Sequence, residues 1–584
     1  MNLGQRLQRL WPHGVVLMAT LLVTRDWWHA GLLGGHSSYM DLFRQVVFDD
    51  AVRHGDLWPR FAEAFYCNHG SLLFHFYAPL SYYITELFML VGAPAAVALK
   101  LALASSVLLS GVFMALLARE LFGDYAAACA GALYVLAPYH LVDVLVRHAF
   151  GEAMAFTWLP LACWGILGAV RDGSAGRMIA GALGVAFLLL THNITAMISA
   201  PLLAFWWLYV TLKYHGGRLH GPLLGICAGA GGLLLTAFFW APAFTETNLI
   251  WSRESLTDEY FRYWNHFVYF KQFFMQYWGF GGSGAGENDG MSFQLGLAHW
   301  ALLAGSIAVF ALRREWRTHL AACWAIVAGS LFMTHFASEP IWSRISTLAF
   351  VQFPWRFLVL AAFGASLAAG SVAQALRDAA GDLWGPKLAL VVIALSFPIY
   401  APYTHAKHTL YVLEKDDYSL FRPAQYLKLQ HQPGYIRPDK MATIEWIRAH
   451  LVRATAREDF LPRTVLAVPE APPERDIIAR ENEILAQKQF GPCHYGAEVN
   501  MIAAGPVVLQ RFWYPGWEAW VDGKKQDLEA YSEYALTAVE VGAGRHLVEF
   551  RFGTTPLRRI SWIVSLVMAA ALLGLLVSDR IARR

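Results

Sequence analysis

The segment GGHSSYMDLFRQVVFDDAVRHGDLWPRFAEAFYCNHGSLLFHFYAP, residues 34–79, follows the first apolar stretch and decides how the rest of the chain is arranged. It places four aspartates among aromatic, arginine and histidine side chains: Asp41, Asp49, Asp50 and Asp56. At helical spacing Asp41, Phe48 and Val52 lie near one another, as in an amphipathic helix at a membrane surface. A buried carboxylate is costly unless it is paired or used, so Asp41, beside a predicted span, is a candidate for chemistry. The alternative is that these acids form a solvated helix face.

The composition is that of a protein embedded in a membrane. Of the 584 residues, 57% are hydrophobic and 15% are charged, whereas a soluble globular protein carries about 25% charged residues. The mean hydropathy is +0.38. The net charge of +3 comes from scattered arginines that follow membrane topology, and no nucleic-acid-binding motif is present. We therefore expect a polytopic α-helical membrane protein without a nucleic-acid partner.

The cysteines and the N-terminus add little chemistry. The six cysteines show neither a C-x-x-C pair nor the ligand spacing of a zinc site. Cys67 and Cys493 fall in predicted external regions, where a disulfide between them is possible. Arg6 and Arg9 precede an apolar stretch that could pass for a signal peptide, but no small-residue cleavage site follows. We interpret this stretch as an uncleaved first span with a cytoplasmic N-terminus.

About twelve segments are apolar enough to cross a membrane, given that a span needs about 20 mostly apolar residues. They are 12–33, 95–118, 125–145, 153–170, 178–192, 194–212, 222–242, 293–311, 319–336, 355–376, 387–402 and 560–578. The segment 72–91 is also apolar, but it contains His75, Pro79 and Glu86. If it does not span, the arginine- and lysine-rich loops fall on the side of the N-terminus; if it does, they are divided between both faces. The charge bias therefore favours a segment 72–91 that lies along the interface.

This topology gathers polar residues from different spans at the outer face. They are Arg147, His148, Glu152, His192, Asn193, Glu246 and Arg356. The same face receives the first outer loop, 34–94, and the long loop 243–292, which ends in the glycine-rich GFGGSGAGENDG. That run lacks a P-loop lysine, and it is either a mobile lid or an ordinary surface loop. Titratable groups that converge on one rim are typical of a site at the lipid–water boundary.

From residue 401 the sequence becomes polar and rich in proline, arginine and glutamate. Strands are predicted at 507–512, 518–521, 536–541 and 546–552, separated by turns at YPGW, VDGK and GAGR. We therefore divide the chain into a transmembrane domain at 1–402, an extracytoplasmic β-rich domain at 403–559, and a last span with a basic cytoplasmic tail at 560–584.

An external carboxylate near the bilayer, surrounded by arginines and histidines, suits the transfer of a sugar from a lipid-linked phosphate. The carboxylate can take a proton from the acceptor hydroxyl. Cations can then offset the charge that builds on the departing phosphate, and the planar fork of arginine matches phosphate oxygens. The pattern predicts a glycosyltransferase that uses a lipid carrier.

Several longer motifs resemble a known family. GDLWPRF, FHFYAPLSYY, RHAFGEAMAFTWLPL, LLLTHNITA, QFPWRFL, YPGWEAWVDGK and GRHLVEFRF resemble bacterial integral membrane proteins labelled 6-pyruvoyl-tetrahydropterin synthase-related, although the zinc histidine motif of the soluble synthase is absent. The architecture and the segment LARELFGDYAAACAGALYVLAPYHLVD are also similar to GT-C glycosyltransferases, the class of oligosaccharyltransferases, protein O-mannosyltransferases and aminoarabinose transferases. That resemblance implies a polyprenyl-phosphate-linked sugar donor and a catalytic acid in the first outer loop, which Asp41 matches.

These observations predict a GT-C-like glycosyltransferase of the bacterial cytoplasmic membrane that modifies an envelope glycan, lipid or protein at the outer face. Asp41 is the expected base and Glu152 or Asp143 the second acid, although Glu152 could instead pair with Arg147. Expected ligands of the donor phosphate are Arg147, Arg356 and His192, and further site candidates are His148, Asn193, Glu246 and Tyr77. A divalent metal ion at Asp41, Glu152 and a histidine is conceivable, but no diagnostic spacing supports one, and no metal ligands are assigned.

Two other classes of protein fit part of the pattern. A transporter of lipid-linked sugars would use a similar cationic groove, but it should keep charges deep inside its spans along a crossing path. Few mid-span charges occur here, and Arg25 with Asp26 is the notable exception. A non-catalytic membrane scaffold would need neither Asp41 nor Glu152 and would have no enclosed pocket at the outer rim.

Overall fold

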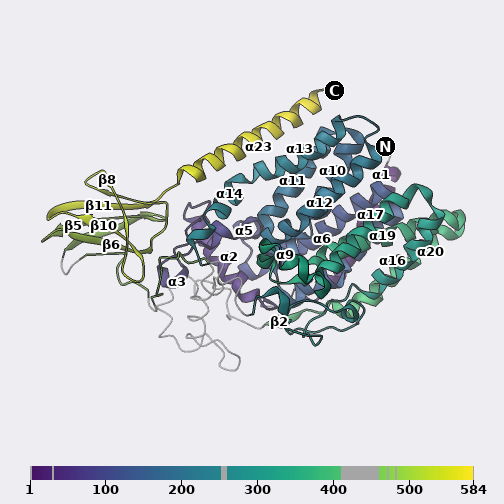
Figure 1. Cartoon of the computed structure of the whole chain (residues 1–584), viewed down its shortest axis with the longest axis horizontal. Helices are drawn as coiled ribbons and strands as arrows, with labels where there is room; N and C mark the ends of the chain where they lie inside the picture. The colour runs from purple at the N-terminus through teal and green to yellow at the C-terminus, as the bar shows by residue number, and fades with distance from the viewer. Residues whose placement is uncertain are drawn as a thin grey trace.

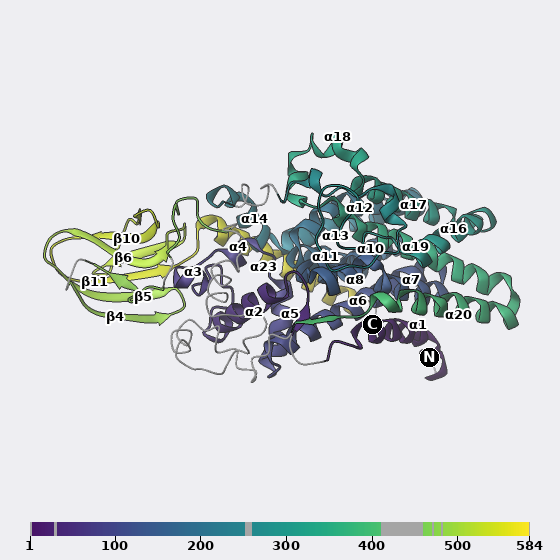
Figure 2. The ribbon, with the colours of Figure 1, turned by 90° about the horizontal axis from the view of Figure 1, so that it is seen from below.

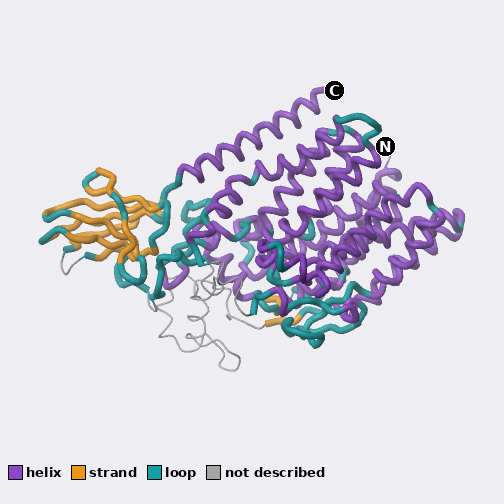
Figure 3. Tube along the Cα trace, in the orientation of Figure 1, coloured by secondary structure: helices purple, strands orange, loops and turns teal. Residues whose placement is uncertain are grey.

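The structure of the protein, a computed structural model, describes residues 3–28, 32–251, 260–409, 460–469, 472–479 and 483–582. A bundle of long helices forms most of the molecule, and two β-sheets form a separate domain at one end of it (Figure 1, Figure 3). The beginning of the first helix and the end of the last helix both lie at the end of the bundle remote from the sheets (Figure 1, Figure 2). Both chain ends therefore lie away from the sheets (Figure 1, Figure 2).

Each of the twelve predicted spans overlaps a helix. These helices are α1 (Leu3–Thr24), α6 (Ala95–Phe122), α7 (Asp124–Leu136), α10 (Trp158–Asp172), α11 (Ala175–Thr191), α12 (Asn193–Tyr214), α13 (His220–Leu235), α16 (Leu297–Leu312), α17 (Arg317–Thr334), α19 (Leu358–Ala379), α20 (Gly381–Tyr400) and α23 (Pro556–Ala582). Within the described residues, six helices are long and apolar enough to cross a membrane, or up to eight if each of two bent helix pairs is counted as one span. The chain is a multi-pass membrane protein with a predominantly helical fold.

The first span is shorter than the sequence predicts. Helix α1 ends at Thr24 rather than near residue 33, and Leu32–Gly34 form strand β1. The reason is local: Arg25 and Asp26 follow the helix, and both bind His405, Arg25 Nη2 at 2.8 Å and Asp26 Oδ2 at 2.8 Å. Leu32–Gly34, further along the chain, are extended and pair with another segment.

The apolar segment 72–91 does not form one long helix. It contains α4 (Leu73–Phe76) and α5 (Leu80–Leu90), separated by Tyr77, Ala78 and Pro79. Eleven helical residues rise only about 16 Å, well short of the roughly 30 Å of a hydrocarbon core. Phe48 of helix α2 (Ser38–Arg53) packs against this segment, with its ring 4.8 Å from that of Tyr83. The first outer loop is therefore a packed helical unit that does not itself cross a bilayer.

The C-terminal domain consists of two antiparallel sheets. One sheet has the order β3 (Ile477–Ile478), β6 (Gly505–Phe512), β10 (Leu536–Val541) and β9 (Glu529–Tyr531). The other has the order β4 (Ile484–Gly491), β5 (His494–Met501), β11 (Gly544–Phe552), β7 (Trp517–Val521) and β8 (Lys524–Gln526). The four strands predicted from sequence correspond to β6, β7, β10 and β11, and alternate residues of these strands form a buried apolar core.

Contacts of the first outer loop join this domain to the helical bundle. Just before that loop, strand β1 pairs with β2 (Lys407–Thr409) in antiparallel register, Leu32 opposite Thr409 and Gly34 opposite Lys407, and this two-stranded sheet is separate from the two sheets of the domain. The first outer loop packs on the sheets through Phe61, whose ring lies 5.3 Å from that of Trp517. Cys67 and Cys493 are both free thiols, so the disulfide that their location allows is not formed.

Candidate active site at the bend before α10

The candidate site is built where a predicted span is interrupted. After α7 the chain forms α8 (Pro138–Leu141), a π-helical turn η1 (Val142–Arg147) and a short helix α9 (Phe150–Ala155) before α10 begins. His148, between η1 and α9, has a φ of +49°, in the left-handed region that a non-glycine residue rarely adopts. Single π-turns and such backbone outliers are frequent at functional sites. The bend brings Arg147 and Glu152, five positions apart, into direct contact.

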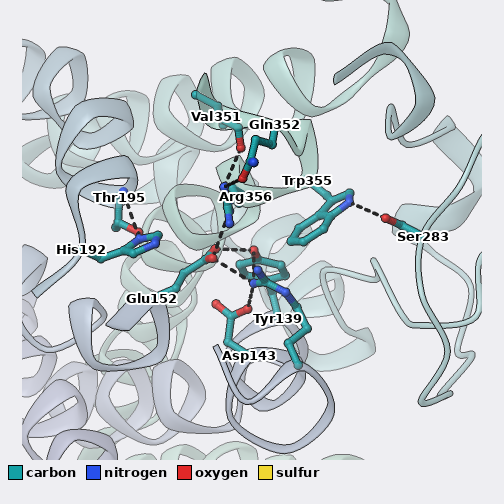
Figure 4. Close-up of polar contacts among 11 residues, drawn as sticks. Tyr139, Asp143, Glu152, His192, Thr195, Ser283, Val351, Gln352, Trp355 and Arg356 are labelled. Carbon is teal, nitrogen blue, oxygen red and sulfur yellow. Dashed lines mark hydrogen bonds and ion pairs between the residues drawn. The ribbon is translucent and has the colours of Figure 1, made fainter. Parts of the chain in front are cut away.

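Glu152 is the centre of a buried ionic cluster (Figure 4). Its Oε2 lies 3.0 Å from Arg147 Nη1 and accepts from Arg356 Nε at 3.1 Å. The hydroxyl of Tyr139 donates to Glu152 Oε1 at 2.7 Å, and Arg147 also pairs with Asp143. Segments far apart in the sequence thus meet at one carboxylate.

The charges of this cluster balance. Asp143 and Glu152 are buried, and so are Arg147 and Arg356, with 8% and 7% of their surface exposed. Buried charges are tolerated when they are paired and hydrogen-bonded, and each of the four has at least one such partner, although Oδ2 of Asp143 has none among the described residues. Arg356 is held further by two acceptors from its own loop, Val351 O at 2.6 Å and Gln352 Oε1 at 3.2 Å.

Some donor groups of the two arginines remain unused. Arg147 contacts its acidic partners and Tyr139 through Nη1, and its guanidinium lies over the ring of Trp355, 4.3 Å from the ring centre. Arg356 uses Nε and Nη1. The Nη2 groups of both side chains have no hydrogen-bond partner among the described residues. Each arginine can therefore donate to an added anion without releasing Glu152.

Asp41 contacts His148, the residue that follows Arg147 of this cluster. Its Oδ2 is 3.0 Å from Nδ1 of His148, and both side chains are buried. The backbone is also joined there, since His36 N donates to Val146 O and Ser37 N to Arg147 O, each at 3.1 Å. The start of the first outer loop is thereby fixed against η1.

Gly35 is required for this close approach. A Cβ added at Gly35 would lie 2.6 Å from Cβ of His148 and 3.0 Å from its backbone nitrogen, closer than side chains tolerate. The glycine lets the loop that carries Asp41 contact the bend before α10.

Tyr77, Asn193 and His192 border the same region. Arg44 lies over the ring of Tyr77 at 5.0 Å, and burial raises the pKa of the Tyr77 hydroxyl, with Arg44 opposing and Asp41 adding to the shift. Asn193 Nδ2 donates to the carbonyl of Phe76 at 3.0 Å. His192 accepts from Thr195 N through Nδ1 at 3.2 Å, and its ring lies beside Glu152 (Figure 4). His192 acts as the N-cap of α12.

An apolar pocket of about 430 Å³ opens next to the ionic cluster. It is lined by Phe76, Leu189, Asn193, Leu233, Phe239, Trp240, Ala243, Phe244, Thr247, Ile250, Phe350 and Phe460. Two of these residues are chain neighbours of the cluster, because Asn193 follows His192 and Phe350 precedes Val351. The cavity therefore lies near the ionic cluster, although none of the charged residues of the cluster lines it.

Glu246 belongs to a different cluster. It ends helix α14 (Ala237–Thr245) and accepts from Arg558 Nε and Nη2 at 3.0 and 2.6 Å and from the Tyr514 hydroxyl at 3.0 Å. His75 Nε2 lies 2.9 Å from the same carboxylate, and His75 Nδ1 faces Arg60 Nη1 at 2.9 Å. This cluster joins the first outer loop, α14, the β-domain and the last helix, and it is separate from the contacts of Glu152.

The sequence analysis missed several partners of the cluster. Tyr139 and Gln352 were not singled out, and Asp143 was weighed only as an alternative to Glu152. Asp143 lies four residues before Arg147, and that helical spacing is the one signal that would have paired them. Tyr139 and Gln352 carry no such signal, since their partners come from other turns or depend on the loop conformation.

The described residues do not form a metal site. Among them, no group of three or more histidine, cysteine, aspartate or glutamate side chains could hold a metal ion. Asp41 is bound by His148, and Glu152 is surrounded by two guanidinium groups and a hydroxyl, a donor set that repels a divalent cation. The conceivable metal ion at Asp41, Glu152 and a histidine does not fit this arrangement, and no chemical step is assigned to one.

Comparisons with known proteins give distant similarities. No protein-family model matches the sequence. An uncharacterized protein of Lactococcus lactis subsp. cremoris is 20% identical over 235 residues, which are 39% of this chain and 38% of that protein. The resemblance to 6-pyruvoyl-tetrahydropterin synthase-related proteins therefore stays a prediction.

Three solved structures are similar to the chain with TM-scores below 0.5. The oligosaccharyltransferase of Archaeoglobus fulgidus in its apo form has a TM-score of 0.44 at 14% identity, covering 80% of this chain and 65% of that chain. Mycobacterial arabinofuranosyltransferase AftD gives 0.40 at 13%, covering 68% and 26%. ArnT of Cupriavidus metallidurans, bound to undecaprenyl phosphate, gives 0.37 at 15%, covering 77% and 85%. The chain spans less than two thirds of the length of the lactococcal relative and of the first two of these structures. What each of these proteins binds or transfers is a property of that protein.

Proposed function

We propose that the protein is a GT-C-like glycosyltransferase of the bacterial cytoplasmic membrane. It transfers a sugar from a polyprenyl-phosphate-linked donor to a hydroxyl of an envelope glycan, lipid or protein at the outer face. The chain is divided for this purpose into a catalytic transmembrane domain at 1–402, an extracytoplasmic domain at 403–559 and a final anchoring helix with a cytoplasmic tail.

The observation that carries the proposal is the adjacency of three features. The Asp41–His148 pair, the two arginines on Glu152 and the apolar pocket are contributed by the first outer loop and by five other segments of the chain. A lipid-linked donor consists of an apolar chain, a phosphate and a sugar in that order, which corresponds to the pocket, the arginines and Asp41. The pocket accommodates part of the chain, and the unused Nη2 groups of Arg147 and Arg356 bind phosphate oxygens by charge-assisted hydrogen bonds.

The reaction then follows from these positions. Asp41, oriented by its hydrogen bond with His148, takes the proton of the acceptor hydroxyl. The acceptor oxygen forms a bond to the anomeric carbon of the donor sugar as the bond from that carbon to the phosphate oxygen breaks. The electron pair leaves with the polyprenyl phosphate, and Arg147 and Arg356 offset the charge that builds on it. Glu152 holds the two guanidinium groups in place.

The first test is the substitution Asp41→Asn in the full-length protein. Because general-base catalysis contributes about 10²–10⁴-fold, we expect transfer from a lipid-linked sugar to fall by at least about 100-fold, with the thermal unfolding temperature retained. The matched control is Asp50→Asn on the same helix α2, where the carboxylate is partly exposed beside His54. Transfer that is unchanged in Asp41→Asn removes Asp41 from the mechanism.

A further inference from the structure

A second cavity lies in the β-domain, far along the chain from the proposed transfer site. It has a volume of about 180 Å³ and is formed where the edge strand of each sheet, β3 and β4, face each other. Its lining consists of Pro473, Glu474, Arg475, Asp476, Ile477, Gln487, Lys488, Gln489 and Tyr495. We propose that this cavity is a binding site for a single uncharged sugar residue.

A buried network supports the wall of the cavity. Arg511 of β6, 4% exposed, donates to Asp476 Oδ1 at 2.6 Å and to the Tyr495 hydroxyl at 2.8 Å. Gln487 Oε1 accepts from the backbone nitrogen of Ile477 at 2.9 Å, which joins the two sheets. These contacts fix the orientation of the lining side chains before any ligand binds, and such preorganisation favours binding.

The same side chains present unused donors and acceptors. Among the described residues, Gln487 Nε2, Gln489 Oε1 and Asp476 Oδ2 have no hydrogen-bond partner. A sugar hydroxyl is both a donor and an acceptor, so adjacent hydroxyls can satisfy an amide nitrogen and a carboxylate oxygen together. The cavity thus offers the mixture of polar groups that a polyhydroxylated ring requires.

Charge and size exclude other small ligands. Glu474 and Asp476 are balanced by Arg475 and Lys488, so the lining has no net charge that would favour an anion or a cation. The volume is below the roughly 300 Å³ at which pockets for drug-sized ligands begin. One ring, rather than an extended chain, fits these limits.

The cavity also contacts the first outer loop. Glu63 accepts from the hydroxyl of Tyr495 and, at 3.4 Å, from Gln489 Nε2. A sugar bound beside Gln489 would therefore lie next to the loop that carries Asp41. The inference does not depend on the transferase proposal, because binding at this cavity requires neither Asp41 nor the arginine cluster.

The test is a titration of the full-length protein in nanodiscs, without any lipid donor, followed by saturation-transfer NMR. The probes are methyl glycosides of neutral hexoses and pentoses, methyl glucuronide as an anionic sugar, and a neutral tripeptide. We expect the neutral glycosides to bind with Kd on the order of 1 mM, and the glucuronide and tripeptide to bind at least about tenfold more weakly.

Variants locate the binding. Gln487→Ala combined with Gln489→Ala should weaken binding of the neutral glycosides at least about tenfold, and Asp476→Asn, which keeps the shape of the side chain, should weaken it severalfold. The control is Gln526→Ala on β8, at the opposite edge of the same sheet, which should bind as the wild type does. Absence of glycoside binding, a preference for the glucuronide or the tripeptide, or unchanged binding in the pocket variants would each overturn the inference. Glycoside binding by a protein that transfers no sugar would instead count against the proposed function alone.

Discussion

At the level of single residues, Glu152 is the group on which the candidate site depends most. It accepts hydrogen bonds from Arg356 and Tyr139 and pairs with Arg147, and only 1% of its surface is exposed. Its removal would leave two guanidinium groups buried with one fewer acid between them. The structure therefore gives Glu152 a positioning role in addition to any role in the chemistry.

We expect Glu152→Ala to lower the free energy of unfolding by about 3–5 kcal/mol, the usual cost of breaking a buried ion pair. Glu152→Gln should cost less, because the amide oxygen can still accept from Arg356. A suitable control is Glu120→Ala, since Glu120 also pairs with two arginines, Arg171 and Arg177, but is about a quarter exposed. That control should cost no more than about 1 kcal/mol. Equal losses of stability in the two alanine variants, measured by chemical denaturation, would contradict the expected role of Glu152.

The cluster around Glu246 predicts a dependence of stability on pH. Burial lowers the pKa of His75 to about 4, below its ordinary 6.5. Burial alone would raise the pKa of Glu246, but hydrogen bonds from His75 and Arg558 outweigh it and lower that pKa to about 2. Both pKa values are lower in the folded protein than in the unfolded chain, which favours neutral His75 and ionised Glu246. As the pH falls, the unfolded chain therefore binds protons before the folded protein does.

The free energy of unfolding should therefore decrease between about pH 6.5 and 4 as His75 titrates, by at most about 1.4 kcal/mol per pH unit for one proton. The contribution of Glu246 to stability is lost at lower pH, between its ordinary pKa of 4.5 and its folded pKa of about 2. In His75→Gln the decrease above pH 4.5 should become shallower. The exposed His54 serves as the control, and a decrease that is the same in His75→Gln and His54→Gln would refute the assignment to His75.

At the level of elements, the break between α13 and α14 forms the apolar pocket. The two helices are bent by 67° at Thr236, and Phe239, Trp240, Ala243 and Phe244 of α14 line the cavity. The hydrogen bonds of Glu246 hold the far end of α14 against Arg558. A straight helix through residues 220–245 would not place these side chains in the pocket.

Filling this pocket should raise the KM for a donor with a long lipid chain. Ala243→Trp adds a ring to a position that is 8% exposed. If the donor loses burial of two CH₂ groups at about 0.8 kcal/mol each, its KM should rise about tenfold. Short-chain donor analogues should be affected less. Leu234→Trp on the exposed side of α13 is the control. An unchanged KM for the long donor in Ala243→Trp would show that the lipid does not occupy the pocket.

The elements also show what the sequence could predict. Long apolar runs determine helices wherever they occur, so each of the twelve predicted spans overlaps a helix, and the short length of α5 agrees with an interfacial segment 72–91. The π-turn before His148 was not predictable, because it depends on Asp143 O accepting from Ala149 N and on the first outer loop packing against it. Strand β4 is not predicted because polar residues interrupt its apolar ones without alternation and its residues are exposed on both faces.

The sequence predicts which residues belong to the site better than it predicts which of them contact one another. Charged residues in apolar surroundings are conspicuous, and Arg147, Glu152 and Arg356 do meet. Glu246 met the same criterion, yet it contacts Arg558 instead, more than 300 positions further along the chain. Sequence alone places such groups at one end of the bundle and does not determine which of them touch.

At the level of the whole molecule, the charge bias and the shape predict a definite topology. Both chain ends lie at the end of the bundle remote from the β-domain (Figure 1, Figure 2). The topology proposed from the positive loops puts the chain ends in the cytoplasm and the sheets outside.

Single cysteines in a cysteine-free background test this topology. Lys525→Cys on β8 should react with a membrane-impermeant maleimide in intact cells, because β8 is exposed and lies outside in the proposed topology. Arg218→Cys, in the exposed turn between α12 and α13, should react only after the membrane is permeabilised. Labelling of Arg218→Cys in intact cells would reverse the assignment of sides and with it the outward-facing site.

The pairing of β1 with β2 has a consequence for biosynthesis. Leu32–Gly34 precede the loop that bears Asp41, and their strand partner, Lys407–Thr409, is made only after α20 has left the ribosome. The backbone groups of β1 that bond to β2 therefore lack these partners while nearly all the helices are inserted. The earliest part of the loop to be translated is among the last to acquire its native neighbours, so a nascent chain halted before residue 407 would still lack that strand partner.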